Sequence, residues 1–258
     1  MIDLHSHLLP GVDDGSKSVE QSLQVLSRFK DQGIAGVCLT PHLLASLAPY
    51  PLPESHDRAF SALQAVAPPE VRLYRGAEIM LDRPLGAAVA EERRITLNAS
   101  RYALVEFPRV VVAQTVEHAV ANVVAIGLVP VVAHPERYRC CTPDAVRRWK
   151  ALGALMQVDG PTLLSSRSRG LRARQLVEFG LADIAAADNH GDERSLRLVR
   201  DAFVEQGGEP QAELLISANP LAIVEDRTLE PVPPFIWRVS LSDRVKALFG
   251  RHTDLDRP

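Results

Sequence analysis

The chain has 258 residues, of which 46% are hydrophobic and 24% are charged, and its formal net charge is -3. This composition is ordinary for a globular protein, and the negative net charge argues against sequence-independent binding of nucleic acid. No run approaches the roughly 20 apolar residues of a membrane span, and the first residues lack a secretory signal. Three cysteines, two of them adjacent, do not suit a disulfide framework. We therefore expect a cytoplasmic protein without a transmembrane segment.

Seven short apolar runs have the length and composition of β-strands, and helical patterns separate them. This alternation predicts a parallel sheet. Closed α/β barrels usually have eight strands, so seven favour a distorted seven-stranded β/α (TIM-like) barrel over an open doubly wound sheet. The predicted strands are Ile2–Leu4, Ile34–Thr40, Val71–Glu78, Tyr102–Glu106, Leu128–Ala133, Ala154–Val158 and Asp183–Ala187.

Three of the intervening segments carry clear helix signals. Ser18 can cap the first helix, which Gly33 ends, and a second helix runs from about Ala113 to Ile126. A third helix begins after Thr142, where a proline takes the first helical position. Residues 43–70 are too long for a tight connection and predict a loop plus one helix. The apolar residues predicted to share the buried face of the first helix are Leu23, Leu26 and Phe29.

Polar side chains follow six of the seven predicted strands, at the point where each strand ends. In a β/α barrel the carboxyl ends of the strands share the face that carries the active site. Carboxylates such as Glu78 and Glu106 are costly to bury there without a cation. The residues predicted to form a metal site are therefore His5, His7, Asp14, His42, Glu78, Glu106, His134, Asp188 and His190.

These side chains offer imidazoles and carboxylates but no thiolate, which suits manganese, iron, cobalt or zinc rather than a structural zinc. Nine ligands fit two or three ions, and clustered divalent ions favour the hydrolysis of a phosphate ester. Arg137 follows His134 by three residues and offers a fork-shaped donor for phosphate. His56, His118 and His252 lie outside the strand ends and receive no role.

The ordered series HSH, PGVDDG, TPH, GAEI, VEFP, AHPERY and ADNH resembles the polymerase and histidinol phosphatase (PHP) superfamily over roughly residues 1–226. Within it, LPGVDDG and HPERY are similar to the manganese-dependent bacterial protein-tyrosine phosphatases found with capsule and exopolysaccharide genes. The resemblance implies a distorted barrel with a centre of up to three Mn2+ ions. It also implies a phosphotyrosine protein substrate, a bacterial tyrosine kinase of polysaccharide export.

The resemblance also implies which residues bind each of three metal ions. The first ion takes His5, His7, Glu78 and Asp188; the second shares Glu78 and adds Glu106 and His134; the third takes Asp14, His42 and His190. A hydroxide between two ions attacks phosphorus in this family while the arginine of HPERY steadies the phosphoryl oxygens. The residues assigned to catalysis are Arg137, Asp188 and His190, and those assigned to substrate binding are Arg137 and Arg194, with Arg197 as an alternative to Arg194.

Two features of the sequence bear on the substrate and on the nucleophile. Relatives often follow TPH with a polar residue that assists the leaving group, whereas this chain has Leu43 and Leu44. A phenol leaves with a pKa near 10, so the departure favours an aryl ester. Cys141 and Arg147 match the C-x5-R spacing of cysteine-dependent phosphatases, but the loop lacks glycine and its proline removes a donor. We therefore expect no cysteine nucleophile.

Two other functions stay open. One is histidinol phosphatase, or another small-molecule phosphomonoesterase of the same superfamily. The other is a non-catalytic, metal-bound regulator of the kinase, against which the full ligand set argues. A nuclease would need a basic strand-binding groove, which the charge pattern does not supply.

The composition changes near Pro231, which predicts a division into residues 1–230, the phosphatase barrel, and residues 231–258, a C-terminal tail. The tail contains a short amphipathic stretch over Ser240–Phe249. Such a stretch either packs on the barrel or docks on a partner.

Overall fold

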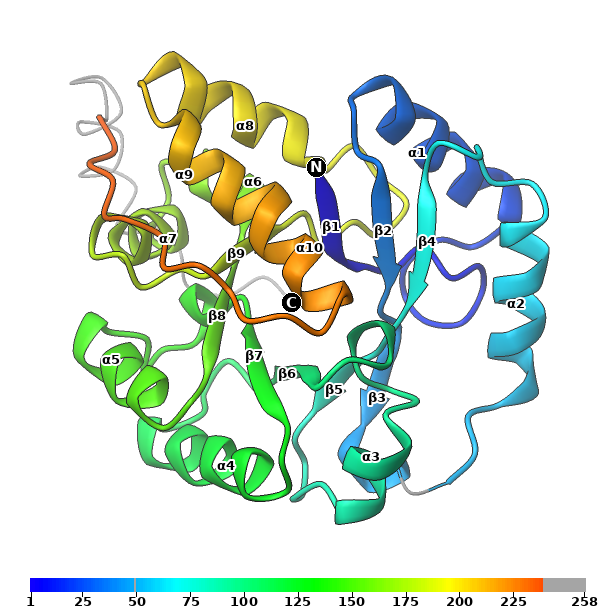
Figure 1. Ribbon diagram of the computed structural model, residues 1–258, viewed down its shortest axis with the longest axis horizontal. Helices are drawn as coiled ribbons and strands as arrows, with labels where there is room; N and C mark the ends of the chain where they lie inside the picture. Colours follow the sequence, from blue (N-terminus) through cyan, green and yellow to red (C-terminus); the bar gives the residue numbers. More distant parts are fainter. Residues whose placement is uncertain (49, 239–258) are drawn as a thin grey trace.

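A computed structural model describes residues 1–48 and 50–238 (Figure 1). Within these residues the chain has a mixed α/β fold whose nine strands pair in parallel in two sheets. The smaller sheet has the order β1-β2-β4, with β1 Ile2–Ser6, β2 Gly36–Leu39 and β4 Arg72–Arg75. The larger has the order β3-β5-β6-β7-β8-β9, with β3 His42–Leu44, β5 Glu78–Met80, β6 Tyr102–Glu106, β7 Val129–Ala133, β8 Leu155–Asp159 and β9 Ile184–Ala186.

The predicted count of seven strands is not confirmed, because one predicted run divides between the sheets and an additional strand follows another. The second run ends as β2 before Pro41, which has no N–H to donate to a ladder, and the chain enters the other sheet as β3. The third run divides into β4 and β5 at Gly76, where an added Cβ would lie 2.9 Å from Cys38 Sγ. The described strands form two parallel sheets, so the predicted closed barrel is not confirmed; one backbone bridge, Ser6 to Asn189, connects the two sheets.

The predicted helices are present as α1 Val19–Asp31, α4 Ala113–Ala125 and α5 Pro143–Ala151. Ser18 and Thr142 cap α1 and α5, since their side chains accept from backbone N–H groups. Residues 43–70 contain one helix as predicted, and also β3 and a short turn. The remaining elements are η1 Ala45–Leu47, α2 Glu54–Gln64, α3 Ala87–Glu92, η2 Leu97–Ala99, η3 Pro135–Arg137, α6 Gly160–Leu163, α7 Ser168–Glu178, α8 Leu196–Glu205, α9 Glu209–Glu213, η4 Leu214–Ala218 and α10 Asn219–Val224.

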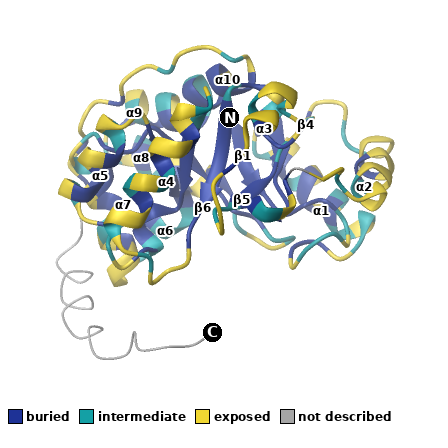
Figure 2. Cartoon of the chain, turned by 90° about the horizontal axis from the view of Figure 1, so that it is seen from below, coloured by how far each residue is buried: buried dark blue, intermediate teal, exposed yellow. Residues whose placement is uncertain are grey.

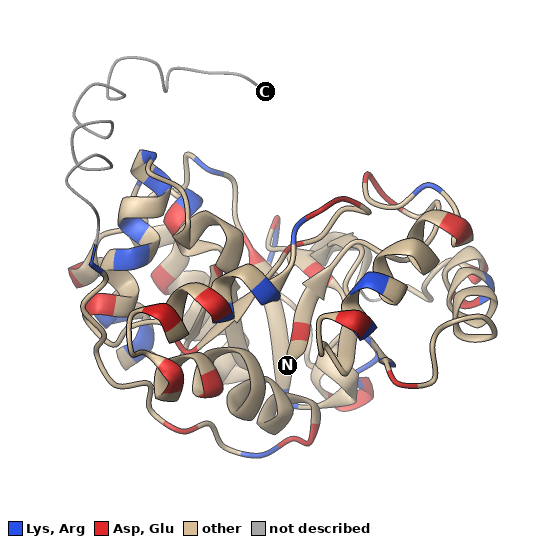
Figure 3. Cartoon of the chain, turned by 90° about the horizontal axis from the view of Figure 1, so that it is seen from above, with Lys and Arg blue, Asp and Glu red and all other residues tan. Residues whose placement is uncertain are grey.

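Helices cover the strands, which are buried almost throughout (Figure 2). The first helix shows how the amphipathic pattern is used, because α1 buries Val25, Leu26 and Phe29. Leu23, predicted for the same face, is only half-buried. Acidic and basic side chains are interspersed over the helices and loops (Figure 3), so the outer surface carries no single sign of charge.

The described part of the C-terminal tail packs on the rest of the chain. The ring of Phe203 in α8 lies 5.1 Å from that of Phe235 and 4.9 Å from that of Trp237. The amphipathic stretch predicted over Ser240–Phe249 lies outside the described residues. Among the described residues, no helix combines the length and apolarity that crossing a membrane requires.

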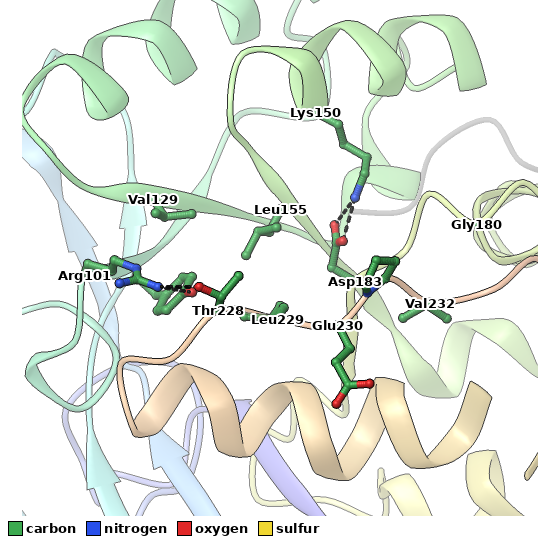
Figure 4. Close-up of a pocket in the computed structure, with 12 residues that line it drawn as sticks. Arg101, Val129, Lys150, Leu155, Gly180, Asp183, Thr228, Leu229, Glu230 and Val232 are labelled. Atoms are coloured by element: carbon green, nitrogen blue, oxygen red, sulfur yellow. Dashed lines mark hydrogen bonds and ion pairs between the residues drawn. The ribbon is translucent and has the colours of Figure 1, made fainter. Parts of the chain in front are cut away.

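A cavity of about 440 Å³ lies at the amino ends of β6, β7 and β8, where the segment after α10 passes over it (Figure 4). Polar contacts join some of its lining residues: Lys150 Nζ donates to Asp183 Oδ1 at 2.6 Å, and Arg101 Nη2 donates to Thr228 Oγ1 at 3.3 Å. None of the residues predicted for the metal site lines it. The chemistry is therefore expected at the opposite ends of the strands.

The buried face of helix α1 can be tested by mutation. Leu26→Ala should lower the free energy of unfolding by about 2–5 kcal/mol, because it leaves a cavity in a fully buried position. Leu23→Ala should cost clearly less, because that side chain keeps contact with solvent. Urea denaturation followed by circular dichroism measures both, and equal losses would contradict the assigned face.

Candidate metal centre

The nine residues predicted for the metal site come together where β1, β2, β4, β6, β7 and β9 end. His5 lies in β1, Glu106 ends β6, and His134 directly follows β7. His42 and Glu78 open β3 and β5 and are register partners across the sheet. Every one of the nine belongs to at least one group whose ligand atoms lie within 4.8 Å of one another: His7–Asp14–His42–His190, His5–Glu78–His134, His5–His7–Asp188 and His42–Glu78–Glu106.

Glu78 lies at the middle of this cluster and is 1% exposed. Its Oε2 lies 3.2 Å from His5 Nε2 and 3.0 Å from His42 Nδ1. Its Oε1 lies 2.8 Å from His134 Nε2. Burial by itself would raise the pKa of the Glu78 carboxyl, but the imidazoles around it hold that pKa well below its usual range. Glu78 is therefore a carboxylate that can face several cations at once.

Asp188 provides a second shared carboxylate. Its Oδ1 lies 3.3 Å from both His5 Nε2 and His7 Nε2. Asp188 and His134 have positive φ values, 49° and 34°, in the left-handed region that most side chains avoid. Such backbone costs on the order of 1–3 kcal/mol and persists only where the surroundings enforce it. At both positions it turns a side chain into the cluster directly after a strand.

The cluster opens to solvent at Asp14, whose side chain is 68% exposed. Asp14 Oδ1 lies 3.5 Å from His42 Nε2 and 3.6 Å from His190 Nε2. His190 Nδ1 contacts the Asp188 carbonyl oxygen at 3.0 Å, which only an N–H on Nδ1 can satisfy. The Nε2 atom of His190 therefore keeps its lone pair and faces the open side of the site.

Two supporting residues were not predicted from the sequence. Asp13 Oδ2 contacts His7 Nδ1 at 2.7 Å, and Gln157 Oε1 contacts His5 Nδ1 at 2.9 Å. Partners of this kind fix the tautomer and orientation of a ligand histidine. Their sequence signals are weak: Asp13 stands beside the predicted ligand Asp14, and Gln157 is a polar residue within an apolar strand.

The turn that carries Asp13 is built tightly against His7. A Cβ added to Gly15 would lie 2.0 Å from the His7 carbonyl oxygen, so only glycine fits there. Asp13 also accepts hydrogen bonds from the backbone N–H groups of Gly15 and His42. Burial opposes ionisation of Asp13, but His7 and these N–H groups lower the pKa of its carboxyl to about 2.

Two arginines reach the cluster. Arg137 Nη2 donates to Asp159 Oδ2 at 2.5 Å and also to Asp188. Asp159 ends β8, the one predicted strand to which the sequence assigned no site residue. Arg194 Nη1 lies 3.5 Å from Asp188 Oδ2, whereas Arg197 pairs with Asp201 along α8. Of the two arginines that followed ADNH as candidates, only Arg194 thus lies beside the cluster.

The donor set fits divalent cations. The Nε2 atoms of His5 and His7 lie 3.3 Å apart and face the same two carboxylates, so several lone pairs converge on one place. Burial opposes protonation of His7 and His42, but neighbouring carboxylates raise the pKa of His42 to about 10 and that of His7 well above its ordinary value. A divalent cation supplies the same positive charge and uses the nitrogen lone pairs instead of protons.

The residues without an assigned role lie elsewhere. Burial raises the pKa of the Cys141 thiol to about 12, and the side chain is 5% exposed. The following Thr142 caps α5 as predicted, so this segment is a helix start and not a phosphate-binding loop. His56 and His118 lie in α2 and α4, away from the cluster, and His252 lies outside the described residues.

Comparisons with known proteins give a consistent result. Residues 1–225 match the family described as "Capsular polysaccharide synthesis, CpsB/CapC". Tyrosine-protein phosphatase CpsB of Streptococcus pneumoniae is 29% identical over 244 residues, which cover 89% of this chain and 100% of that protein. Tyrosine-protein phosphatase YwqE of Bacillus subtilis (strain 168) is 27% identical over 243 residues, with 91% and 95% covered.

Solved structures agree with the sequence comparisons. One is described as "Crystal structures of YwqE from Bacillus subtilis and CpsB from Streptococcus pneumoniae, unique metal-dependent tyrosine phosphatases". It matches with a TM-score of 0.72 and 25% identity, and covers 92% of this chain and 100% of that one. A probable 2-pyrone-4,6-dicarboxylic acid hydrolase from Acinetobacter baumannii shares the fold alone, with a TM-score of 0.51, 14% identity and coverage of 87% and 98%.

The supporting role of Asp13 is testable through metal affinity. Asp13→Asn should weaken Mn2+ binding by about 10- to 100-fold, because His7 loses the carboxylate that orients its ring. Asp31→Asn, which removes an exposed acidic group at the end of α1, is the matched control and should bind as the parent does. Isothermal titration calorimetry of the metal-free proteins measures both, and equal affinities would remove Asp13 from the site.

Metal binding should also depend on pH in a defined direction. The raised pKa values of His7 and His42 mean that both imidazoles still hold protons at neutral pH, and each must lose its proton to bind a cation. The apparent Mn2+ affinity should therefore rise from pH 6 to pH 8 and continue to rise above pH 7. Titrations in buffers of different ionisation enthalpy report the protons released; a plateau near an ordinary histidine pKa of about 6.5 would contradict the prediction.

Proposed function

The chain belongs to the CpsB/CapC family of capsular polysaccharide synthesis, and on this premise we propose that it is a metal-dependent tyrosine-protein phosphatase. The main support is the cluster in which Glu78 faces four imidazoles with Asp188 beside them. Relatives named tyrosine-protein phosphatases match over nearly their whole length. The proposed substrate is a phosphotyrosine protein, a bacterial tyrosine kinase that controls capsule or exopolysaccharide synthesis.

We propose Mn2+ as the cofactor, bound as two or three ions. His5, His7 and Asp188 form one group of converging atoms with Glu78 close to both histidines. The other proposed ligands are Asp14, His42, Glu106, His134 and His190. When bound, such ions activate water and neutralise phosphate oxygens. His42 belongs both to the group around Glu78 and to the group around Asp14, so it connects the buried and the open ends of the cluster.

Arg137 and Arg194 are the proposed contacts for the phosphoryl oxygens. The Arg137 side chain is 20% exposed and Asp159 holds it at the edge of the cluster. A guanidinium presents two parallel N–H donors, which match two oxygens of a phosphoryl group. We assign Arg137, Asp188 and His190 to catalysis: Arg137 steadies the phosphoryl group, Asp188 holds His5 and His7, and His190 keeps Nε2 free toward the open side.

The finer architecture and the location also belong to the proposal. We propose that the two sheets together form the distorted seven-stranded barrel, counting β2 with β3 and β4 with β5 as single interrupted strands. The bridge between Ser6 and Asn189 supports this, because it joins the end of β1 to the segment after β9. The division at residue 230 and the cytoplasmic location stay predictions.

Metal removal and readdition test the function. Chelated protein should lose activity on p-nitrophenyl phosphate and on a phosphotyrosyl peptide, and should recover best with Mn2+, since the ligands lack thiolates. Cys141→Ser should keep its turnover, because the buried thiol is not the attacking group. Full activity of the metal-free protein would contradict the mechanism. Faster hydrolysis of histidinol phosphate would favour the small-molecule phosphatase, and metal binding without hydrolysis would favour the non-catalytic regulator.

Arg137 has a separate kinetic test. Arg137→Ala should reduce turnover about thirty- to a thousandfold, which corresponds to roughly 2–4 kcal/mol of lost transition-state stabilisation, while the metal content is retained. Arg137→Lys should recover only part, because an ammonium group cannot hold two oxygens side by side. His134→Ala is the control for loss of the metal site, and this variant should lose both metal and activity. Unchanged kinetics in Arg137→Ala would make the residue structural, as would loss of its metal.

A further inference from the structure

Three neighbouring loops at the mouth of the site each present an exposed arginine. Arg109 follows β6, Arg139 follows β7, and Arg167 precedes α7 after β8. Because β6, β7 and β8 are adjacent in the larger sheet and run in parallel, the loops of Arg109 and Arg139 leave the same edge of it as the short helix α6, which Arg167 follows. That edge is also where Glu106, His134 and Asp159 lie. We call Arg109, Arg139 and Arg167 the arginine rim.

Direct contacts connect the three loops. The backbone N–H of Arg139 donates to the carbonyl oxygen of Arg109 at 2.9 Å, which joins the first loop to the second. Arg172 in α7 donates through Nε to the carbonyl oxygen of Glu136 at 2.8 Å, which joins the second loop to the helix that Arg167 precedes. These contacts connect the backbone segments that carry the arginine rim.

The charges of the arginine rim are uncompensated. Several other surface arginines have carboxylate partners, as Arg58 does in Glu54 and Arg148 does in Glu117. Across residues 1–48 and 50–238, no acidic group pairs with the guanidinium groups of Arg109, Arg139 and Arg167, and no polar atom there accepts a hydrogen bond from them. Three exposed positive charges thus stand together on a chain whose net charge is negative.

Exposed aliphatic side chains accompany these charges. Val110 and Val112 follow Arg109 and are 66% and 61% exposed, and Leu164 lies on the loop of Arg167 with 41% exposure. Single exposed apolar residues are common and carry no argument alone. Beside three unpaired guanidinium groups they make a surface suited to a chain that carries both carboxylates and apolar side chains.

Given the proposed phosphatase function, on which this inference rests, we propose that the arginine rim binds acidic residues that flank the phosphotyrosine of the protein substrate. Guanidinium groups take carboxylates in a fork-shaped, two-point contact, and an extended segment that leaves the cluster on the side of β6, β7 and β8 passes these loops. The substrate class is therefore an acidic segment of a protein, whose aliphatic side chains pack on Val110 and Val112.

The test compares peptides with a small aryl phosphate on the metal-loaded full chain. The triple variant Arg109→Gln, Arg139→Gln, Arg167→Gln should raise KM about tenfold for a phosphotyrosyl peptide flanked by Asp and Glu, at two- to fivefold per exposed charge pair. Its kcat on that peptide and its kcat/KM on p-nitrophenyl phosphate should be unchanged. The parent's preference for the acidic peptide over a Lys-flanked one should shrink as salt is added, because exposed charges are screened.

A second triple variant controls for net charge. Arg58→Gln, Arg148→Gln and Arg227→Gln remove the same charge from arginines that have acidic partners, and should leave the KM for the acidic peptide as in the parent. An equal rise in both variants would overturn the proposal, as would an unchanged KM in the arginine-rim variant. Binding to phosphatidylglycerol vesicles that the arginine-rim variant loses, without any change in peptide KM, would assign the surface to a membrane and also overturn it. Failure of the parent on every phosphate ester would instead refute the phosphatase function.

Discussion

The structure depends on the need to balance buried negative charge at one place. Glu78 and Asp188 are almost fully buried carboxylates that share the same histidines. Burying such charges costs several kcal/mol each unless cations face them at short range. The chain can therefore bury these carboxylates only because the surrounding imidazoles and Arg137 face them. A site that must gather this much positive charge is also a site that takes divalent ions readily, and the same constraint thereby connects stability with chemistry.

Parallel strands solve the problem of bringing these groups together. Each carboxyl end delivers one or two side chains to the same edge, and the loops behind them hold those side chains in place. Asp13 orients His7 and Gln157 orients His5. Left-handed backbone at His134 and Asp188 turns both residues inward shortly after β7 and β9. Ligand geometry is thus fixed by residues that do not themselves face the open site.

Charge is graded from the centre of the site to its edge. The buried carboxylates Glu78 and Asp188 lie innermost, Arg137 and Arg194 adjoin them through Asp188, and the arginine rim lies on the outer loops. An anionic substrate that approaches over the arginine rim meets positive charge before it meets these buried carboxylates, which favours capture over repulsion. The cavity at the other ends of the strands has no such gradient, because its lysine is already paired with Asp183.

The sequence by itself determined the helices α1, α4 and α5 and the nine residues of the cluster, because caps, periodicity and strand ends are local signals. Only the tertiary structure decided that the third predicted run divides between the sheets and that β3 follows the second, since this depends on Pro41 and on the close approach of Gly76 to Cys38. The tertiary structure also places Arg194, and not Arg197, beside the cluster. It shows Asp159 and Gln157 as partners of site residues. Those relations join residues far apart in the chain, and no local pattern encodes the distance between them.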